Sequence, residues 1–494
     1  MIKKPTKLDG LNISNFEALL ESGEEINLQS ARLIPFYKPG DEMSLVSIFL
    51  SGLRLVKEFR DNISKAVNLS KAGKMHVFTE VEFLLFDKKR VDGLIIIVRG
   101  NKIIDSALLE MKNKNSELDE VQISNYLQIA KEYKIPKLIT VTNQFVSNPS
   151  QSPITVKVPK YVNMYHLSWS YILTVGNLLL FKNQHNIEDE DQVEIMHEIL
   201  NYFENDKSGV LGFTQMKQGW TDIVNKINVG TSINLKDPAL DDTISSWLEE
   251  ERDMSLILSR QLGTLVDSSK RQFKDDLIKR TEYEKRELLK NNSIESILRI
   301  DGAVSDVIVT PHLDRRNIQM SVSLNAPTDR STRSQITWVK NQLNYLEKKN
   351  PELFASIKKE VIIEIILKFT SAPVQVGVDD LDEVWYDLKD KQIKSFNISQ
   401  IRYLGKKFEN RKRFVTELEG MLCSYYEIVV ENLKQWIKPP PKIVKEAEIK
   451  INVPDAKMKN ILKKEVVPEV EVVSEEGSAP SMPKRRGLSK FFSR

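Results

Sequence analysis

Residues 43–142 alternate between helical and strand periodicity, and this alternation restricts the segment to an α/β fold. Apolar side chains recur three or four positions apart in the helical stretches and at every second position in the strand stretches. The elements predicted from this pattern are, in chain order, a helix over 43–67, strands over 76–86, 92–98 and 102–112, a helix over 116–133 and a strand over 138–142. A mixed sheet flanked by helices is therefore expected, with a tight turn between its second and third strands.

The rest of the chain divides by composition and periodicity. The pattern predicts a long charged helical zone over residues 240–292, an α+β region after it and a final long helix over 414–436, which three prolines follow. We expect five parts: an N-terminal arm (1–40), the first α/β domain (41–215), a helical connector (216–292), a second α+β domain (293–437) and a disordered tail with a basic end (438–494).

Composition excludes several classes of protein. Among 494 residues there are 72 Lys and Arg against 69 Asp and Glu, so bulk charge does not mark a nucleic-acid binder. One cysteine excludes a disulfide framework or a Cys-rich zinc site. No phosphate-binding Gly-x-x-x-x-Gly-Lys-Ser/Thr loop occurs. No apolar run approaches the roughly 20 residues of a membrane span, so we expect a cytoplasmic protein without a transmembrane segment.

Two carboxylates stand at matching positions of the predicted hairpin. Asp92 begins one strand, and Glu110 lies near the end of the other. With the turn centred on residues 100–101, position 92 pairs near position 109 or 110, so the two carboxylates lie close together. Strand alternation puts Lys112 on the same face as Glu110.

Both acids lie in or beside apolar runs, where a charge needs a partner or a metal ion. Two convergent carboxylates suit Mg²⁺ or Mn²⁺, which prefer oxygen ligands. Such an ion polarises a phosphate and lowers the pKa of a bound water, and a neighbouring lysine can orient or deprotonate that water. The spacing of Asp92, Glu110 and Lys112 therefore predicts a site for phosphodiester hydrolysis.

The pattern Asp-(x)n-Glu-x-Lys, together with the order of the predicted elements, resembles the PD-(D/E)XK nuclease superfamily. Gln122 and Tyr126 are four residues apart on the following helix, which resembles the Gln-x-x-x-Tyr motif of the RecB-like and lambda-exonuclease-like branch. The resemblance implies a restriction-endonuclease-like core and roles for Gln122 and Tyr126 near the site. It also implies Glu80 as a further metal ligand, with Glu58 and Glu82 as other acids in comparable places. Val91 stands where the superfamily usually has proline.

A wider resemblance covers most of the chain. Segments from Phe49 to Phe145, from Ile336 to Leu343 and from Leu433 to Pro441 look like an uncharacterised bacterial family of PD-(D/E)XK proteins. That resemblance implies no settled function.

Three further segments suggest partners. Basic residues beside Phe408 could grip a nucleic-acid backbone or form a solvated helix face: Lys406, Lys407, Arg411, Lys412 and Arg413. Residues 484–494 are basic with a few apolar side chains, which favours contact with a membrane surface, a nucleic acid or a protein partner. Residues 240–292 could mediate self-association.

The leading hypothesis is a metal-dependent nuclease acting on DNA, with a leaning towards end processing. In it Asp92, Glu110 and Glu80 bind the metal ion and Lys112 activates water. The alternative is a non-catalytic nucleic-acid-binding or scaffold protein of a bacterial stress or phage-defence system that keeps the nuclease fold. A third interpretation is an adaptor that docks to a membrane or a sliding clamp through residues 484–494.

Overall fold

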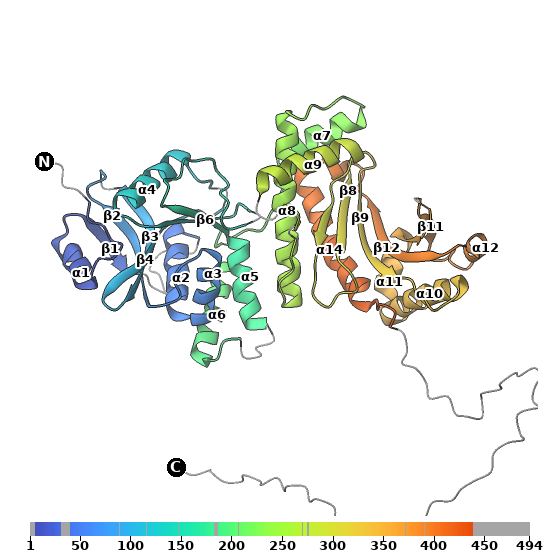
Figure 1. The fold of residues 1–494 in the computed structure, drawn as a ribbon, viewed down its shortest axis with the longest axis horizontal. Coiled ribbons are helices and arrows are strands. Elements are labelled where there is room, and N and C mark those ends of the chain that lie inside the picture. The colour runs from blue at the N-terminus through green and yellow to red at the C-terminus, as the bar shows by residue number, and fades with distance from the viewer. Residues whose placement is uncertain are drawn as a thin grey trace, which may run out of the picture. The chain divides into compact units, whose positions relative to one another are not determined.

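The computed structural model describes residues 5–30, 40–87, 89–114, 116–146, 148–181, 186–205, 207–268, 270–273, 276–370, 372–389 and 391–437. Within this part the chain is a mixed α/β protein with two six-stranded sheets, β1–β6 and β7–β12 (Figure 1). The expected α/β class is thus confirmed. The tail expected at 438–494, including the basic end at 484–494, lies outside the described residues.

The first sheet is mixed, and its strands follow one another in chain order. Antiparallel pairing joins the first four strands, and parallel pairing joins the last three. The strands are β1 (Ile26–Ser30), β2 (Lys74–Phe83), β3 (Lys89–Arg99), β4 (Lys102–Met111), β5 (Lys137–Thr142) and β6 (Asn163–Ser168). Gly100 and Asn101 both have positive φ and form the tight turn between β3 and β4, as the sequence predicts.

Helices cover both faces of this sheet, and each face has its own apolar core (Figure 1). Four helices share a core with one face: α2 (Glu42–Leu55), α3 (Lys57–Ala66), α5 (Trp169–Leu180) and α6 (Glu190–Phe203). The other face packs against α1 (Ile13–Ser22) and α4 (Glu120–Glu132). Strands buried on both faces explain the nearly continuous apolar run in β3.

Two local expectations for this region need correction. Residues 5–30 are not a loose arm, since α1 packs against the sheet and β1 forms its edge strand. The single helix expected over 43–67 is two helices, which meet at Val56. This residue has an extended backbone and is fully buried, and its N–H and carbonyl still serve the two flanking helices. Because the helix is broken at Val56, α3 takes a different direction from α2 and packs Phe59 and Ile63 into the core.

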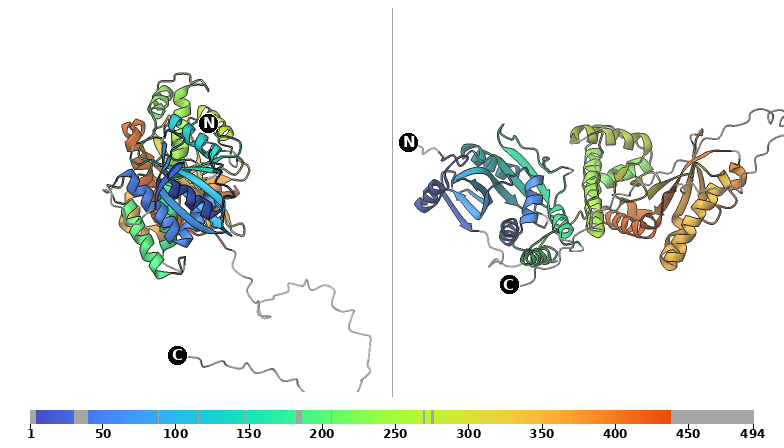
Figure 2. Two further views of the ribbon diagram at one scale, coloured as in Figure 1. Left: turned by 90° about the vertical axis from the view of Figure 1, so that its left-hand side faces the viewer. Right: turned by 60° about the horizontal axis from the view of Figure 1, so that its bottom comes forward.

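The second sheet is antiparallel, in the order β11-β10-β12-β9-β8-β7. Its strands are β7 (Ser296–Leu298), β8 (Val307–His312), β9 (Asn317–Asn325), β10 (Val361–Leu367), β11 (Val374–Gly377) and β12 (Ile393–Tyr403). Alternate side chains of β9 and β10 are buried, so one face carries the core. The helices α10 (Thr332–Lys349) and α14 (Arg411–Ile428) lie along this sheet (Figure 2).

The remaining short elements complete the second half of the described chain. They are α11 (Pro351–Ile357), η2 (Lys358–Glu360), α12 (Trp385–Leu388), α13 (Lys406–Glu409) and η3 (Val430–Asn432). Phe354, Leu388 and Phe408 anchor three of these elements in the same core as the sheet.

The segment expected as a helical connector contains α7 (Gln218–Asn228), α8 (Pro238–Leu262) and α9 (Leu277–Asn291). The zone 240–292 is therefore two helices, because Gly263 adopts a left-handed conformation and ends α8. Trp220, Trp247 and Leu288 are buried in one core with the second sheet. Self-association through this zone stays a prediction.

The last long helix is shorter than expected. The apolar pattern predicts a helix over 414–436, whereas α14 ends at Ile428. The side-chain amide of Asn432 donates to the carbonyls of Glu427 and Ile428, which satisfies the end of the helix and stops it there. Trp436 lies beyond the helix and packs edge-on against Trp338.

None of the helices in the described ranges combines the length and the apolar character that a membrane crossing requires.

Candidate functional site

The hairpin register brings Asp92 and Glu110 together. Gly93 on β3 pairs with Leu109 on β4, so the next residue outward on each strand is one of the two acids. The expected pairing is confirmed. The packing of α2 requires glycine at position 93, because a Cβ there would lie 2.9 Å from the Leu50 side chain of this helix. The close approach of α2 in turn holds this end of the hairpin in place.

Glu110 is the most deeply placed acid of the site, with none of its surface exposed. Burial and the charge of the neighbouring Asp92 raise the pKa of Glu110 to about 8, although Lys112 acts in the opposite direction. In its protonated form Glu110 donates a hydrogen bond to Asp92. The raised pKa of Glu110 favours the protonated form that makes this hydrogen bond.

Asp92 is half-buried and fixed by the backbone. Its Oδ2 accepts a hydrogen bond of 2.7 Å from the N–H of Met111. Burial raises the pKa of Asp92, while this hydrogen bond and the charge of Lys112 oppose the rise. This hydrogen bond joins β4 to β3 where their pairing ends, so it holds the Asp92 carboxylate beside Glu110.

Lys112 lies just past β4, between two carboxylates. Its Nζ is 2.7 Å from Glu110 Oε1 and 2.7 Å from Oε1 of Glu42, the first residue of α2. Burial alone would lower the pKa of Lys112, but the charges and hydrogen bonds of Glu110 and Glu42 outweigh burial and raise it. Lys112 is consequently a cation at neutral pH and does not serve as a proton acceptor in this arrangement.

Glu80 lies opposite Asp92 across the β2–β3 pair. Thr79 pairs with Gly93 and Val81 with Val91, which leaves Glu80 and Asp92 facing each other between them. Glu80 has φ 52°, unusual for a residue with a side chain, and the register of β2 against β1 shifts at this point. Burial raises the pKa of Glu80, and the charge of Asp92 adds to the rise. Arg90 Nη1 lies 2.8 Å from Glu80 Oε2, and its positive charge opposes the rise in the pKa of Glu80.

Gln122 and Tyr126 share one face of α4, as predicted, and they bond to each other. The Gln122 side-chain amide donates to the Tyr126 hydroxyl at 2.8 Å, and that hydroxyl donates to the Arg90 carbonyl at 2.7 Å. Burial and the charge of Glu110 raise the pKa of Tyr126, so the hydroxyl keeps its proton. This chain of bonds holds the start of β3, two residues before Asp92.

The carboxylate cluster is formed by Asp92, Glu110, Lys112, Glu80, Glu42 and Arg90. An unsatisfied carboxylate oxygen in it favours a divalent cation, whereas its existing ion pairs do not. No hydrogen-bond donor among the described residues satisfies Oε2 of the buried Glu110. An unsatisfied carboxylate oxygen beside a second carboxylate is a setting that a cation stabilises. In the described ranges, however, no three His, Cys, Asp or Glu side chains are already arranged as a ligand set. Glu80 and Lys112 are engaged in ion pairs instead.

Sequence reasoning missed two members of the cluster, Glu42 and Arg90. Glu42 falls just outside the helix expected over 43–67, and its contact with Lys112 spans 70 residues of chain. The only sequence signal for Glu42 is its place in the first turn of α2, where the helix dipole favours an acid. Glu58 lies on α3, and its buried Oε2 has no hydrogen-bond partner among the described residues.

The predicted basic residues lie elsewhere, at α13 and the start of α14. Three of them line a polar cleft of about 440 Å³ together with side chains of α7 and its approach: Lys406, Arg411 and Lys412 with Gln215, Thr221 and Asn225. Lys407 pairs with Glu417 at 2.6 Å. Arg413 lies on the exposed side of α14. No residue of the carboxylate cluster lines this cleft.

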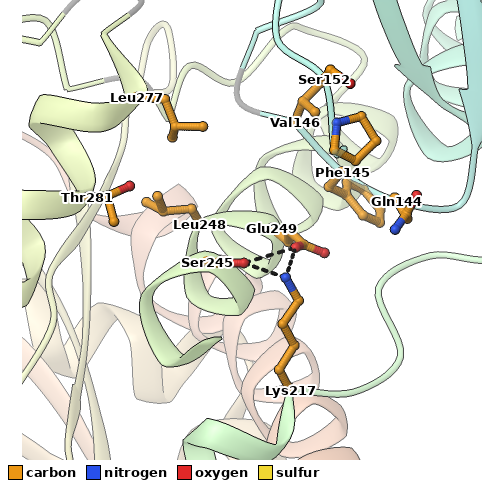
Figure 3. A pocket seen from close by; sticks show the side chains of 11 residues that line it. Gln144, Phe145, Val146, Ser152, Lys217, Ser245, Leu248, Glu249, Leu277 and Thr281 are labelled. Atoms are coloured by element: carbon orange, nitrogen blue, oxygen red, sulfur yellow. Dashed lines mark hydrogen bonds and ion pairs between the residues drawn. The ribbon is translucent and has the colours of Figure 1, made fainter. Parts of the chain in front are cut away.

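A further cavity of about 160 Å³ lies between the loop after β5 and the helices α8 and α9 (Figure 3). Lys217 crosses its polar side, where Nζ reaches Glu249 at 3.0 Å and also contacts Ser245 (Figure 3). Phe145, Leu248 and Leu277 form the apolar side. Sequence reasoning did not find this cavity, because its lining comes from four separate segments: the loop after β5, Lys217, α8 and α9.

Comparisons of the chain with protein-family models, with curated proteins and with solved structures find no match.

Proposed function

We propose that this protein is a metal-dependent nuclease that hydrolyses phosphodiester bonds, with DNA as its substrate class. The observation that carries the proposal is the meeting of two acids, both with raised pKa values, and a lysine at one end of a hairpin. Asp92 and the fully buried Glu110 face each other there, with Lys112 2.7 Å from Glu110. The resemblance of these residues, with Gln122 and Tyr126, to the PD-(D/E)XK superfamily supports the same function.

Asp92 and Glu110 would hold Mg²⁺ or Mn²⁺, with Glu80 as a third ligand. Bound there, the ion would polarise the phosphate and lower the pKa of a bound water. Lys112 would orient that water through Nζ and stabilise the negative charge that develops on the phosphate, because its raised pKa keeps it protonated. Tyr126 and Gln122 would hold the start of β3 and so fix the position of Asp92.

The test is a cleavage assay with Mg²⁺ and with Mn²⁺ on single-stranded and double-stranded DNA, linear and circular, and on a matching RNA. We expect the wild type to degrade DNA, and Lys112→Ala or EDTA to abolish degradation. Lys102→Ala is the matched control, because Lys102 is exposed at the opposite end of the same hairpin. Sparing of circular DNA would assign the activity to strand ends. Intact substrates throughout, with binding equal in wild type and Lys112→Ala, would overturn the proposal.

The second candidate is a non-catalytic nucleic-acid-binding or scaffold protein of a bacterial stress or phage-defence system. The ion pairs favour it, since Lys112 is bound between Glu110 and Glu42 and Glu80 is bound by Arg90. These ion pairs neutralise Lys112 and Glu80 without a metal ion. Under this candidate, Mn²⁺ leaves both thermal unfolding and nucleic-acid binding unchanged.

The basic residues at α13 and α14 would contact the backbone of a longer nucleic acid. The double variant Lys412→Glu/Arg413→Glu is therefore expected to weaken binding of duplexes by about tenfold and to spare short oligonucleotides. Lys348→Glu, a charge reversal at an exposed position of α10, is the control. Fluorescence anisotropy over a series of duplex lengths measures the effect. Equal affinities of the double variant and the control at every length would contradict this role.

A further inference from the structure

A cleft of about 400 Å³ opens beside the carboxylate cluster. Its lining comes from the start of β3 and the first turns of α4: Lys89, Arg90, Asp119, Val121, Gln122, Asn125 and Tyr126. One ion pair ties the cleft to the cluster, and one hydrogen bond within the lining fixes the residue that makes it. The Tyr126 hydroxyl donates to the Arg90 carbonyl, and the Arg90 guanidinium pairs with Glu80. An occupant of the cleft would thus lie beside Arg90, which contacts Glu80, and Glu80 lies opposite Asp92.

Arg90 belongs both to the lining of the cleft and to the cluster. One edge of its guanidinium is 2.8 Å from Glu80, yet 58% of the side chain is exposed. A guanidinium has five N–H donors in a planar fork, so it can bind a carboxylate on one edge and a phosphate on another. The backbone of Arg90 is fixed by Tyr126, which keeps the side chain in this position.

Lys89 supplies a second charge. Among the described residues, no acidic side chain lies within ion-pair distance of Lys89. The one acid in the lining, Asp119, is the N-cap of α4, and its Oδ1 already accepts from the Gln122 N–H at 2.8 Å. Asn125 adds an amide that can donate to a phosphate oxygen. The cleft therefore combines two cations, amide donors and one carboxylate already engaged in a hydrogen bond.

We propose that this cleft binds the phosphodiester backbone of a nucleic-acid strand next to the bond that the carboxylate cluster cleaves. Arg90 and Lys89 bind consecutive phosphates, and Asn125 donates to one of them. The proposal rests on the proposed nuclease function for its choice of ligand. It also assigns Arg90 a positioning role, since Arg90 links the bound phosphate to Glu80.

The test measures binding without cleavage. A fluorescein-labelled oligothymidine of about 12 nucleotides is titrated in EDTA at several salt concentrations, and anisotropy gives Kd. We expect Lys89→Ala to raise Kd by about threefold to tenfold and to reduce the salt slope by about 0.7, the value for one phosphate contact on a single strand. Arg90→Lys is expected to raise Kd despite keeping its charge, because a lysine cannot bridge two acids with a planar fork.

Lys102→Ala is the matched control and is expected to bind as the wild type does. Thermal unfolding of each variant shows that it is folded. Wild-type binding by Lys89→Ala and Arg90→Lys, or no binding by the wild type itself, would overturn the proposal. The outcomes separate from those of the nuclease test: weakened binding with no metal-dependent cleavage keeps the cleft and removes the nuclease, and the reverse pattern removes the cleft alone.

Discussion

Glu110 carries a large electrostatic cost. The residue is fully buried, its pKa is raised to about 8, and Oε2 lacks a donor among the described residues. A protein that needed only the hairpin could replace this side chain with an apolar one of similar size at a gain in stability. A bound cation would offset the free-energy cost of burying the Glu110 carboxylate.

A divalent cation is therefore expected to stabilise the folded protein. Mn²⁺ should raise the midpoint of thermal unfolding, since a ligand at 100 times its Kd adds about 2.7 kcal/mol. Glu110→Gln should lose this shift because it removes one ligand oxygen charge. Differential scanning fluorimetry measures it, with Glu198→Gln, at an exposed position of α6, as the control. A full Mn²⁺ shift in Glu110→Gln would contradict the assignment of the metal ligands.

The Tyr126 hydroxyl is expected to contribute to stability as well as to the site. Tyr126→Phe leaves the Arg90 carbonyl and the Gln122 amide without this partner, which should cost about 1–2 kcal/mol. Chemical denaturation measures the loss. Tyr345→Phe, at an exposed position of α10, should cost nothing measurable. Equal stability of Tyr126→Phe and wild type would mean that solvent replaces both bonds.

At the scale of elements, β2 changes the face to which its side chains point at Glu80. Met75 and Val77 belong to the core under α2, whereas Val81 and Phe83 belong to the core under α4. Strict alternation would place all four on one face. The left-handed backbone of Glu80 produces the reversal and sets its carboxylate opposite Asp92.

This conformation predicts a specific order of stability at position 80. Glu80→Ile should be less stable than Glu80→Gln by about 1–2 kcal/mol, because a β-branched residue is strained at positive φ. Both variants lose the same charge, so the loss of that charge does not account for a difference between them. Glu82→Ile, two residues along the same strand, should show no comparable loss. Equal stabilities of the two position-80 variants in chemical denaturation would contradict the backbone argument.

The hairpin and its acids could be predicted from sequence because their determinants are local. Apolar runs flank the turn at 100–101, and the register follows from that turn. The left-handed backbone of Glu80 could not be predicted, since glutamate has no preference for it. The contact between Glu42 and Lys112 depends on where α2 docks, and no local pattern encodes a pairing 70 residues apart. The strand β12 has a weak apolar periodicity, because the polar residues Lys394, Asn397 and Ser399 interrupt its apolar side chains.

At the scale of the whole described chain, α8 bonds to elements of both halves. On the side of the second sheet, Glu251 of α8 accepts hydrogen bonds from Arg280 of α9 and from the Ser296 hydroxyl of β7. Asp253 on α8 accepts hydrogen bonds from the Ser170 hydroxyl of α5 and from the Phe213 N–H. Arg260, farther along α8, donates to Ser170 and to Thr174. Buried acids surround this contact, and burial raises the pKa of Glu250 and of Asp253.

The acids around α8 predict that stability falls as the pH rises. Burial and the charge of Asp253 raise the pKa of Glu419 to about 8, although Arg260 opposes the rise. A raised pKa gives stability that is complete below the ordinary value near 4.5 and is lost as the pH rises through about 8. Glu419→Gln should therefore flatten the decline in stability between pH 6 and pH 9, by roughly 1 kcal/mol.

Chemical denaturation across this pH range measures the effect. Glu250 titrates in the same direction, so part of the decline should remain in Glu419→Gln. Glu427→Gln, at an exposed position of the same helix, should decline as the wild type does. A slope unchanged by Glu419→Gln would place the pH dependence elsewhere.

The tight turn at residues 100–101 also bears on how the protein folds. It closes a loop of two residues and brings Asp92 and Glu110 together by local chain motion alone. Such hairpins form within microseconds, whereas the parallel pairing of β4 with β5 must wait for α4 to span the sheet. We expect the acidic pair to meet early in folding, with its mutual repulsion slowing the closure of the hairpin until α2 docks against it.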